Sequence, residues 1–188
     1  NDYSGITTVS NGVVVLKTAT GLGTGVNGTT DHTSIASGAA VSLDISGATI
    51  SEYFSINGTG YNNNSTGAIR VPSTSAGNIL SGTITIATAN SRINSDATLL
   101  TLNNATSMTV TNAVTIGGLG EVLISGALSG AGAIIKDGTG AGSILTLKGN
   151  SGSFSGAITV NSNSNILKVS PTVNTNTSVL GTTGMITI

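Results

Sequence analysis

One block toward the C-terminal end of the sequence constrains the fold more than any other feature. Between Leu128 and Val160, short apolar runs alternate with corners made of Gly, Ser, Thr and Asn. Within the runs, apolar and polar side chains alternate with the two-residue period of a β-strand, and no segment has the spacing of an amphipathic helix. The block therefore predicts an all-β fold of short strands joined by tight turns.

The same pattern extends along the whole chain. Pairs such as Asn11-Gly12 and Asp137-Gly138 separate the apolar runs, and these residue types tolerate the positive φ of tight turns. The predicted strands are Val13–Leu16, Val41–Ile45, Thr83–Thr88, Leu99–Leu102, Met108–Thr111, Val114–Ile116, Val122–Ile124, Ala133–Lys136, Ile144–Leu147, Ala157–Val160, Ile166–Val169 and Met185–Ile188.

Two all-β architectures fit such a series of strands, an antiparallel β-sandwich and a parallel β-helix, or β-solenoid. The strands are very short, the corners contain Gly and Asn rather than Pro, and the chain repeats itself. These features favour the β-solenoid and leave the sandwich as the alternative. At roughly 20–25 residues per coil, the chain would form about eight short coils.

The composition agrees with a narrow, regular core. Charged residues make up 7% of the chain and aromatic residues 3%, whereas 38% are hydrophobic. An ordinary soluble domain is about 25% charged, so hydroxyl and amide groups must replace charges on this surface. With a net charge of −1, the chain has little electrostatic attraction for nucleic acid, so we expect no nucleic-acid partner. The absence of Cys excludes disulfides and thiolate metal sites.

The last part of the chain repeats the first part. The matched segments are Tyr3–Gly5 with Phe154–Gly156, Thr8–Val9 with Thr159–Val160, and Leu16–Lys17 with Leu167–Lys168, all at the same sequence offset (154 − 3 = 151). We therefore predict one solenoid over residues 1–188, with repeat-like ends at 1–25 and 128–184 and a divergent middle at 26–127.

The motifs of the second copy resemble a known repeat. They are Ser129–Gly132, Ile135–Gly138, Leu145–Leu147, Gly149–Asn150, Phe154–Gly156 and Thr159–Val160. Together they resemble the passenger-associated repeat of autotransporters, and residues 1–25 resemble its second half. The resemblance implies a right-handed parallel β-helix exposed on a bacterial surface.

The favoured function is a non-catalytic, extracellular structural solenoid of a prokaryotic cell surface, as a filament subunit or a segment of a surface-exposed passenger. Each end carries part of the repeat and neither has an amphipathic capping helix, which predicts end-to-end self-association. An adhesin that binds a cell surface or a glycan is one alternative. A polysaccharide-active enzyme is another, less favoured.

The enzyme alternative requires clustered carboxylates or a basic Arg or Lys. Asp31 and Glu52 are separated in sequence by close to one predicted coil (52 − 31 = 21), and His32 lies beside Asp31. Solvated corner residues are the favoured interpretation of all three. No spacing typical of a metal or nucleotide site occurs, and no apolar run is long enough for a membrane-spanning helix, so we expect no cofactor, no metal and no transmembrane segment.

Residues 51–75 form the least regular part of the sequence and predict a loop that leaves the coil. Three of the five aromatic residues lie there, and we predict a contact surface made of Tyr53, Phe54, Tyr61 and Arg70. The alternative is that the aromatic side chains fill a widened part of the core.

Overall fold

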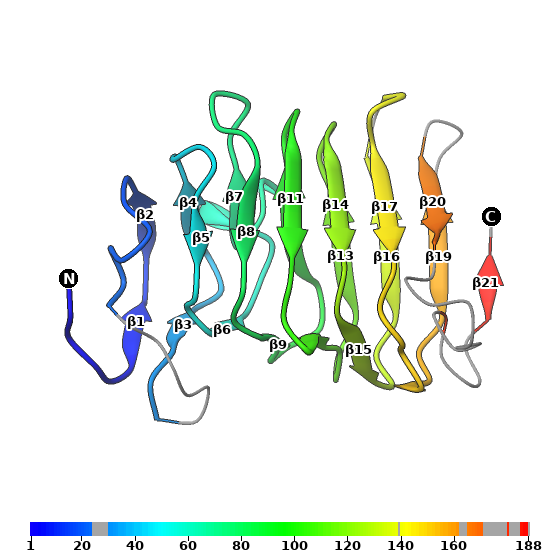
Figure 1. Ribbon diagram of the computed structural model, residues 1–188, viewed down its shortest axis with the longest axis horizontal. Coiled ribbons are helices and arrows are strands. Elements are labelled where there is room, and N and C mark those ends of the chain that lie inside the picture. Colours follow the sequence, from blue (N-terminus) through cyan, green and yellow to red (C-terminus); the bar gives the residue numbers. More distant parts are fainter. Residues whose placement is uncertain (24–29, 139, 162–164, 171–179, 181–184, 188) are drawn as a thin grey trace.

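The computed structural model describes residues 1–23, 30–138, 140–161, 165–170, 180 and 185–187. The chain winds into a β-solenoid of about seven turns, in which three parallel sheets run along the axis (Figure 1). The predicted all-β solenoid is confirmed, and the antiparallel sandwich is wrong because every strand pair between coils is parallel within the described residues.

Each sheet takes one strand from successive coils. Sheet 1 contains β1 (Thr7–Val9), β3 (Thr33–Ile35), β6 (Phe54–Ile56), β9 (Ile84–Ile86), β12 (Thr106–Thr109), β15 (Ala127–Gly130) and β18 (Ser153–Phe154). Sheet 2 contains β2 (Gly12–Leu16), β4 (Ala39–Leu43), β7 (Ile69–Val71), β10 (Ser91–Ser95), β13 (Val114–Gly117), β16 (Ile134–Asp137), β19 (Ile158–Asn161) and β21 (Ile186–Thr187). Sheet 3 contains β5 (Thr49–Ile50), β8 (Asn78–Leu80), β11 (Leu99–Leu102), β14 (Glu121–Ile124), β17 (Ile144–Leu147) and β20 (Ile166–Val169).

The register between coils gives the length of each coil directly. Ile116 pairs with Lys136, a step of 136 − 116 = 20 along the sequence, whereas Thr49 pairs with Ile79, a step of 79 − 49 = 30. Several coils are thus longer than the sequence pattern predicts. The longer coils explain why the chain makes about seven turns instead of eight.

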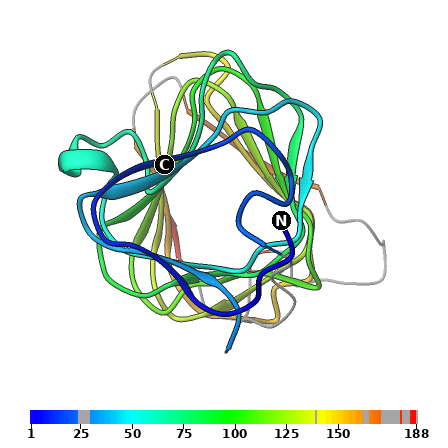
Figure 2. The ribbon, with the colours of Figure 1, turned by 90° about the vertical axis from the view of Figure 1, so that its left-hand side faces the viewer.

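Inward-facing side chains stack into apolar ladders that form one core. In sheet 3, for example, Leu80, Leu102, Ile124 and Leu147 occupy successive coils and are almost completely buried. Figure 2 looks along the axis and shows the coils superimposed around this core. Aliphatic side chains fill most of the narrow space, as the low aromatic content predicts.

Glycine is needed where the backbones of neighbouring coils meet at a corner between sheets 3 and 1. A Cβ atom on Gly126 would lie 1.6 Å from the carbonyl oxygen of Asn104, and one on Gly149 would lie 2.0 Å from that of Gly126. The Asn104 side chain also bridges coils, because its Nδ2 donates to the carbonyl oxygen of Ser81 at 2.5 Å. Small residues and stacked amides therefore hold this corner together.

The two copies of the sequence repeat occupy different sheets. Thr8 and Val9 lie in β1 of sheet 1, whereas the matching Thr159 and Val160 lie in β19 of sheet 2. Of the second copy, residues 162–164, 171–179 and 181–184 lie outside the described residues. Matching strands of the two copies therefore lie in neighbouring sheets. This shift is possible because every sheet of the solenoid is made of the same kind of short strand.

Candidate functional site

Between β6 and β7 the chain leaves the coil as a protruding segment, which we call the overhanging loop (residues 57–68). It contains the short 3-10 helix η1 (Tyr61–Asn63), which stands out from the wall of the solenoid in Figure 2. The predicted irregular segment 51–75 is thus narrower in the structure, because β6 and β7 both fall inside it. Within the loop, Asn62, Asn63 and Ser65 adopt left-handed φ angles of 51°, 54° and 64°.

The overhanging loop closes at a narrow neck. Gly67 N donates to the carbonyl oxygen of Thr59 at 2.8 Å, and a Cβ atom on Gly60 would lie 2.8 Å from the nitrogen of Gly67. Gly60 and Gly67 both have positive φ, at 120° and 103°. Only residues without a side chain allow the two ends of the loop to approach in this way.

Contacts with the coils on both sides hold the loop in place. Asn62 N donates to the carbonyl oxygen of Gly38 at 3.1 Å, and the Ser37 hydroxyl donates to Asn63 Oδ1 at 3.1 Å. On the other side, Asn94 Nδ2 donates to the carbonyl oxygen of Ser65 at 3.5 Å. The loop is therefore anchored against the outer face of sheet 2.

A cavity of about 230 Å³ lies beside the overhanging loop, and we call it the flank groove. Its lining residues are Val13, Val15, Ala40, Ser42, Tyr61, Asn64, Thr66 and Arg70. Val13 and Val15 point outward from β2 and are 45% and 49% exposed, and Tyr61 is 39% exposed. The groove thus combines an apolar strand surface with an aromatic side chain from the loop.

The polar groups of the flank groove are held in fixed positions. Asn64 Oδ1 accepts hydrogen bonds from Thr66 N at 3.2 Å and from Thr66 Oγ1 at 2.7 Å, so its amide nitrogen is oriented by neighbours. Arg70 Nε donates to Asp96 Oδ2 at 2.6 Å, and Nη2 lies 2.5 Å from the same oxygen. Asp96 thus compensates the charge of Arg70.

The structure brings together two of the four residues predicted as a contact surface. Tyr61 and Arg70 line the flank groove, whereas Tyr53 lies just before β6 and lines a separate cavity of about 20 Å³. Phe54 is 1% exposed and packs in the core, so its assignment to a contact surface is corrected. Val13 and Val15 were not predicted, because the sequence does not show that their strand lies beside a loop from a later coil.

The acidic pair considered for catalysis is stacked on neighbouring coils and is buried. Thr33 pairs with Phe54, so Asp31 and Glu52 occupy equivalent positions one coil apart. Asp31 accepts a hydrogen bond from Gly5 N at 3.1 Å, and Glu52 accepts one from Thr33 Oγ1 at 2.7 Å. Asp31 is 6% and Glu52 3% exposed, so they are not the solvated corner residues that we favoured, and the adjacent small cavity is lined by His32 instead.

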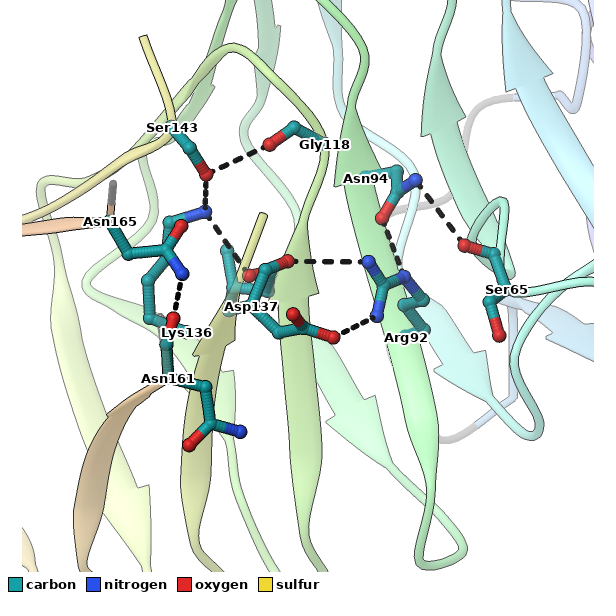
Figure 3. A network of polar contacts seen from close by, with 10 residues as sticks. Ser65, Arg92, Asn94, Gly118, Lys136, Asp137, Ser143, Asn161 and Asn165 are labelled. Carbon is teal, nitrogen blue, oxygen red and sulfur yellow. Dashed lines mark hydrogen bonds and ion pairs between the residues drawn. The ribbon is translucent and has the colours of Figure 1, made fainter. Parts of the chain in front are cut away.

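A polar network crosses several coils on sheet 2 (Figure 3). Arg92 Nε donates to Asn94 Oδ1 at 2.8 Å, and Arg92 Nη1 lies 3.3 Å from Asp137 Oδ2, two coils away. Gly117 lies between Asn94 and Asp137 in the ladder, and a Cβ atom there would lie 2.0 Å from Arg92 Nη2. The missing side chain of Gly117 makes room for this bridge.

Beside this network, Lys136 interrupts an apolar ladder. It stacks between Ile116 and Val160 and is 0% exposed. Its Nζ donates to Ser143 Oγ at 2.7 Å and to the carbonyl oxygen of Ile116 at 3.3 Å, and the Ser143 hydroxyl donates to the carbonyl oxygen of Gly118 at 2.9 Å (Figure 3). Burial, with a smaller contribution from the charge of Arg92, lowers the pKa of Lys136 to about 8. Lys136 is thus enclosed in the core, where Ser143 and the Ile116 carbonyl group accept its hydrogen bonds.

A second polar ladder joins the coils nearer the N-terminal end. Lys17 donates to Asp44 Oδ2, while Ser75 and Thr74 donate to Asp44 Oδ1 at 3.1 and 3.3 Å. The hydrogen bonds from Lys17 and Ser75 lower the pKa of the Asp44 carboxyl group. These contacts link three successive coils on the outside of the rod.

A larger and more open groove, of about 440 Å³, follows the corner of the solenoid. It is lined by Asn103, Asn104, Ala105, Ser125, Gly126, Ala127, Gly149 and Asn150. Asn103 Oδ1 accepts from Ser125 Oγ, and Asn104 bonds to Ser81, Thr83 and Thr106. Most of its amides thus stabilise the corner, and the flank groove is the better candidate for binding.

Within the described residues, no group of three or more His, Cys, Asp and Glu side chains lies close enough to hold a metal ion. None of the helices in that part of the chain is long and apolar enough to cross a membrane. Comparisons with family models, with curated proteins and with solved structures find no match. The autotransporter resemblance therefore rests on the repeat motifs alone.

Proposed function

We propose that the chain is a non-catalytic structural rod of the prokaryotic cell exterior, as a filament subunit or a segment of a longer surface-exposed passenger of the autotransporter type. The observation that carries the proposal is the set of three continuous parallel sheets around one apolar core. Each coil repeats the same ladder contacts, so the architecture extends by adding coils. The low charge and the repeat motifs also support this assignment.

The two ends of the described solenoid support association along the axis. Of the eleven exposed large apolar side chains among the described residues, eight lie on the first or last coil. Two of these eight, Val13 and Val15, face outward into the flank groove, and the six that remain at the ends are Tyr3, Ile6, Ile166, Val169, Met185 and Ile186. Open strand edges with apolar side chains favour pairing with further strands. In a filament these edges would stack on a second copy, and in a passenger on adjoining coils.

Electron microscopy of the purified protein over a concentration series tests the filament version. We expect fibres of uniform width, and we expect Val169→Lys on the last coil to raise the concentration needed for assembly at least tenfold, because a charge on a strand edge opposes pairing. Leu119→Lys is the matched control, since Leu119 is similarly exposed but lies on a middle coil. Dispersed short rods at all concentrations would reject the filament version and favour the passenger version.

Adhesion is the second candidate function, and the flank groove is the observation that favours it. The groove lies on the outside of the rod beside an anchored loop, where a partner has access without disturbing the core. Beads coated with the protein are expected to adhere to cells, and Tyr61→Ala is expected to reduce adhesion. Equal adhesion by the variant would exclude the groove as the contact surface.

A further inference from the structure

We propose that the flank groove binds one pyranose ring of an uncharged saccharide. This inference rests on adhesion as the function of the groove and names the ligand class. The groove presents three kinds of surface within about 230 Å³: an apolar floor, an aromatic side chain and several hydrogen-bonding groups. A pyranose ring has the matching surfaces, since its C–H groups form apolar faces and its hydroxyl groups lie around the edge.

The apolar contact comes from two different coils. Val13 and Val15 of β2 supply the floor, and Tyr61 of the overhanging loop supplies the aromatic surface. No hydrogen bond involves the Tyr61 hydroxyl within the described residues, so the ring and its hydroxyl both remain available to a ligand. Tyrosine provides a large, rigid contact area with a polar end, which suits ligands that are partly apolar and partly polar.

The polar contacts come from groups that are already oriented. Thr66 fixes the Asn64 amide by two hydrogen bonds to Oδ1, which leaves the Nδ2 hydrogens as donors toward the groove. Arg70 is held by Asp96 through Nε and Nη2, which leaves Nη1 as a further donor. Groups fixed before binding lose little conformational entropy when a ligand hydroxyl accepts from them.

The charge of the groove favours an uncharged ligand. Arg70 is the charged residue among those that line it, and the adjacent Asp96 compensates that charge. A carboxylate or sulfate on the ligand would therefore gain little from Arg70, because Asp96 already balances its charge. A neutral hexose needs no such charge pairing and uses the same donors.

The size of the groove limits the ligand and its affinity. Clefts that enclose drug-sized ligands measure about 300–1,000 Å³, so this groove suits a single sugar ring. With so few atoms in contact, we expect a Kd on the order of 1 mM for a monosaccharide. Many copies along an assembled rod would raise the avidity without any additional contact.

Saturation-transfer NMR on the full chain tests the inference, with glucose, galactose, mannose and N-acetylglucosamine as separate probes. We expect transfer to the ring C–H protons of at least one sugar, and at least a fivefold weaker Kd in Tyr61→Ala, since an anchoring side chain is removed. Val15→Ser, which makes the floor of the groove polar, should weaken the binding of the same sugar. Leu119→Ala is the control, because Leu119 is also exposed, at 48%, but lies on a middle coil and outside the groove.

Two outcomes would overturn the inference: no transfer to any of the four sugars, or equal transfer in wild type and Tyr61→Ala. Circular dichroism of each variant confirms that the solenoid is folded. If Tyr61→Ala reduces bead adhesion while none of the sugars binds, the groove remains a contact surface and only the saccharide assignment fails. If sugar binding is present without adhesion, the saccharide assignment stands and adhesion is rejected.

Discussion

Measured along sheet 3, the coils from β8 to β20 have a nearly constant length, whereas the coil between β5 and β8 is longer. In sheet 3, the register partners Ile79, Thr101, Leu123, Thr146 and Lys168 follow one another at nearly equal steps along the sequence, the first being 101 − 79 = 22 and the last 168 − 146 = 22. The step from Thr49 to Ile79 is longer, at 79 − 49 = 30, because the overhanging loop lies in that coil. The regular coils repeat one set of ladder contacts, whereas the long coil adds an outward surface.

The comparison shows that the two kinds of coil depend on different residues. In the regular coils, stability comes from inward aliphatic ladders and from corners such as Gly126, where any side chain would clash. In the long coil, the shape of the loop depends on Gly60 and Gly67 and on hydrogen bonds to neighbouring coils. Substitutions should therefore separate the stability of the rod from the shape of the overhanging loop and its flank groove.

The largest effect is expected from a cavity in a regular ladder. Ile124→Ala removes a side chain that is 0% exposed between Leu102 and Leu147, so we expect a loss of about 2–5 kcal/mol in the free energy of unfolding. Urea denaturation followed by circular dichroism measures it. Leu119→Ala, at an exposed corner, should change stability by less than about 0.5 kcal/mol. Similar losses in both variants would show that the ladders do not dominate stability.

The next effect concerns the charge inside the regular coils. The pKa of Lys136 is lowered from 10.5 to about 8, so between these values the unfolded chain binds more protons than the folded chain. Stability contributed by this group therefore rises with pH across that window, by on the order of 3 kcal/mol in total, and is at its minimum below pH 8.

Lys136→Met should remove this rise and increase stability at pH 7, because it restores the apolar ladder between Ile116 and Val160. Urea denaturation of wild type and variant at pH 7 and pH 10 tests both points. Lys168→Met is the control, since Lys168 is exposed. If the free energy of unfolding changed with pH in the same way in wild type and Lys136→Met, the lowered pKa of Lys136 would be contradicted.

The smallest effect is expected at the neck of the overhanging loop. Gly67→Ala places a Cβ atom 2.5 Å from the carbonyl oxygen of Ile69 at a φ of +103°, so we expect a loss of about 1–3 kcal/mol and weaker sugar binding. Gly77→Ala is the matched control, because Gly77 also has positive φ but has no atom within 4 Å of the added group. Unchanged sugar binding in Gly67→Ala would show that the neck does not determine the shape of the groove.

Much of the architecture could be predicted because the strands and turns of a solenoid coil are encoded by short, continuous stretches of sequence. Runs such as Ile144–Leu147 and Ile166–Val169 match the observed strands β17 and β20. The missed strands are very short, as in β5, or rich in polar residues, as in β10 (Ser91–Ser95). Their extended conformation comes from pairing with neighbouring coils, which local propensity does not report.

The candidate site was less accessible to sequence reasoning, because it depends on which residues stack. Tyr61 and Arg70 were identified from the irregular composition around them. Placing Val13 and Val15 beside them requires the lengths of the intervening coils, and these lengths vary. Lys136 could have been identified as inward-facing, because it shares the alternation of the buried Ile134 in β16. Residue type alone predicts an exposed lysine, whereas the alternation of the strand predicts an inward-facing one. The alternation was the more reliable of these two signals.

The direction of the ladder hydrogen bonds has a mechanical consequence. Strands in this solenoid lie across the axis and their hydrogen bonds run along it, so tension applied along the rod loads a few bonds at a time instead of shearing whole strands together. We expect the rod to open coil by coil from an end, each step releasing roughly 70–100 Å of extended chain. Such a rod would yield in small steps under tension and would absorb work before it opens completely.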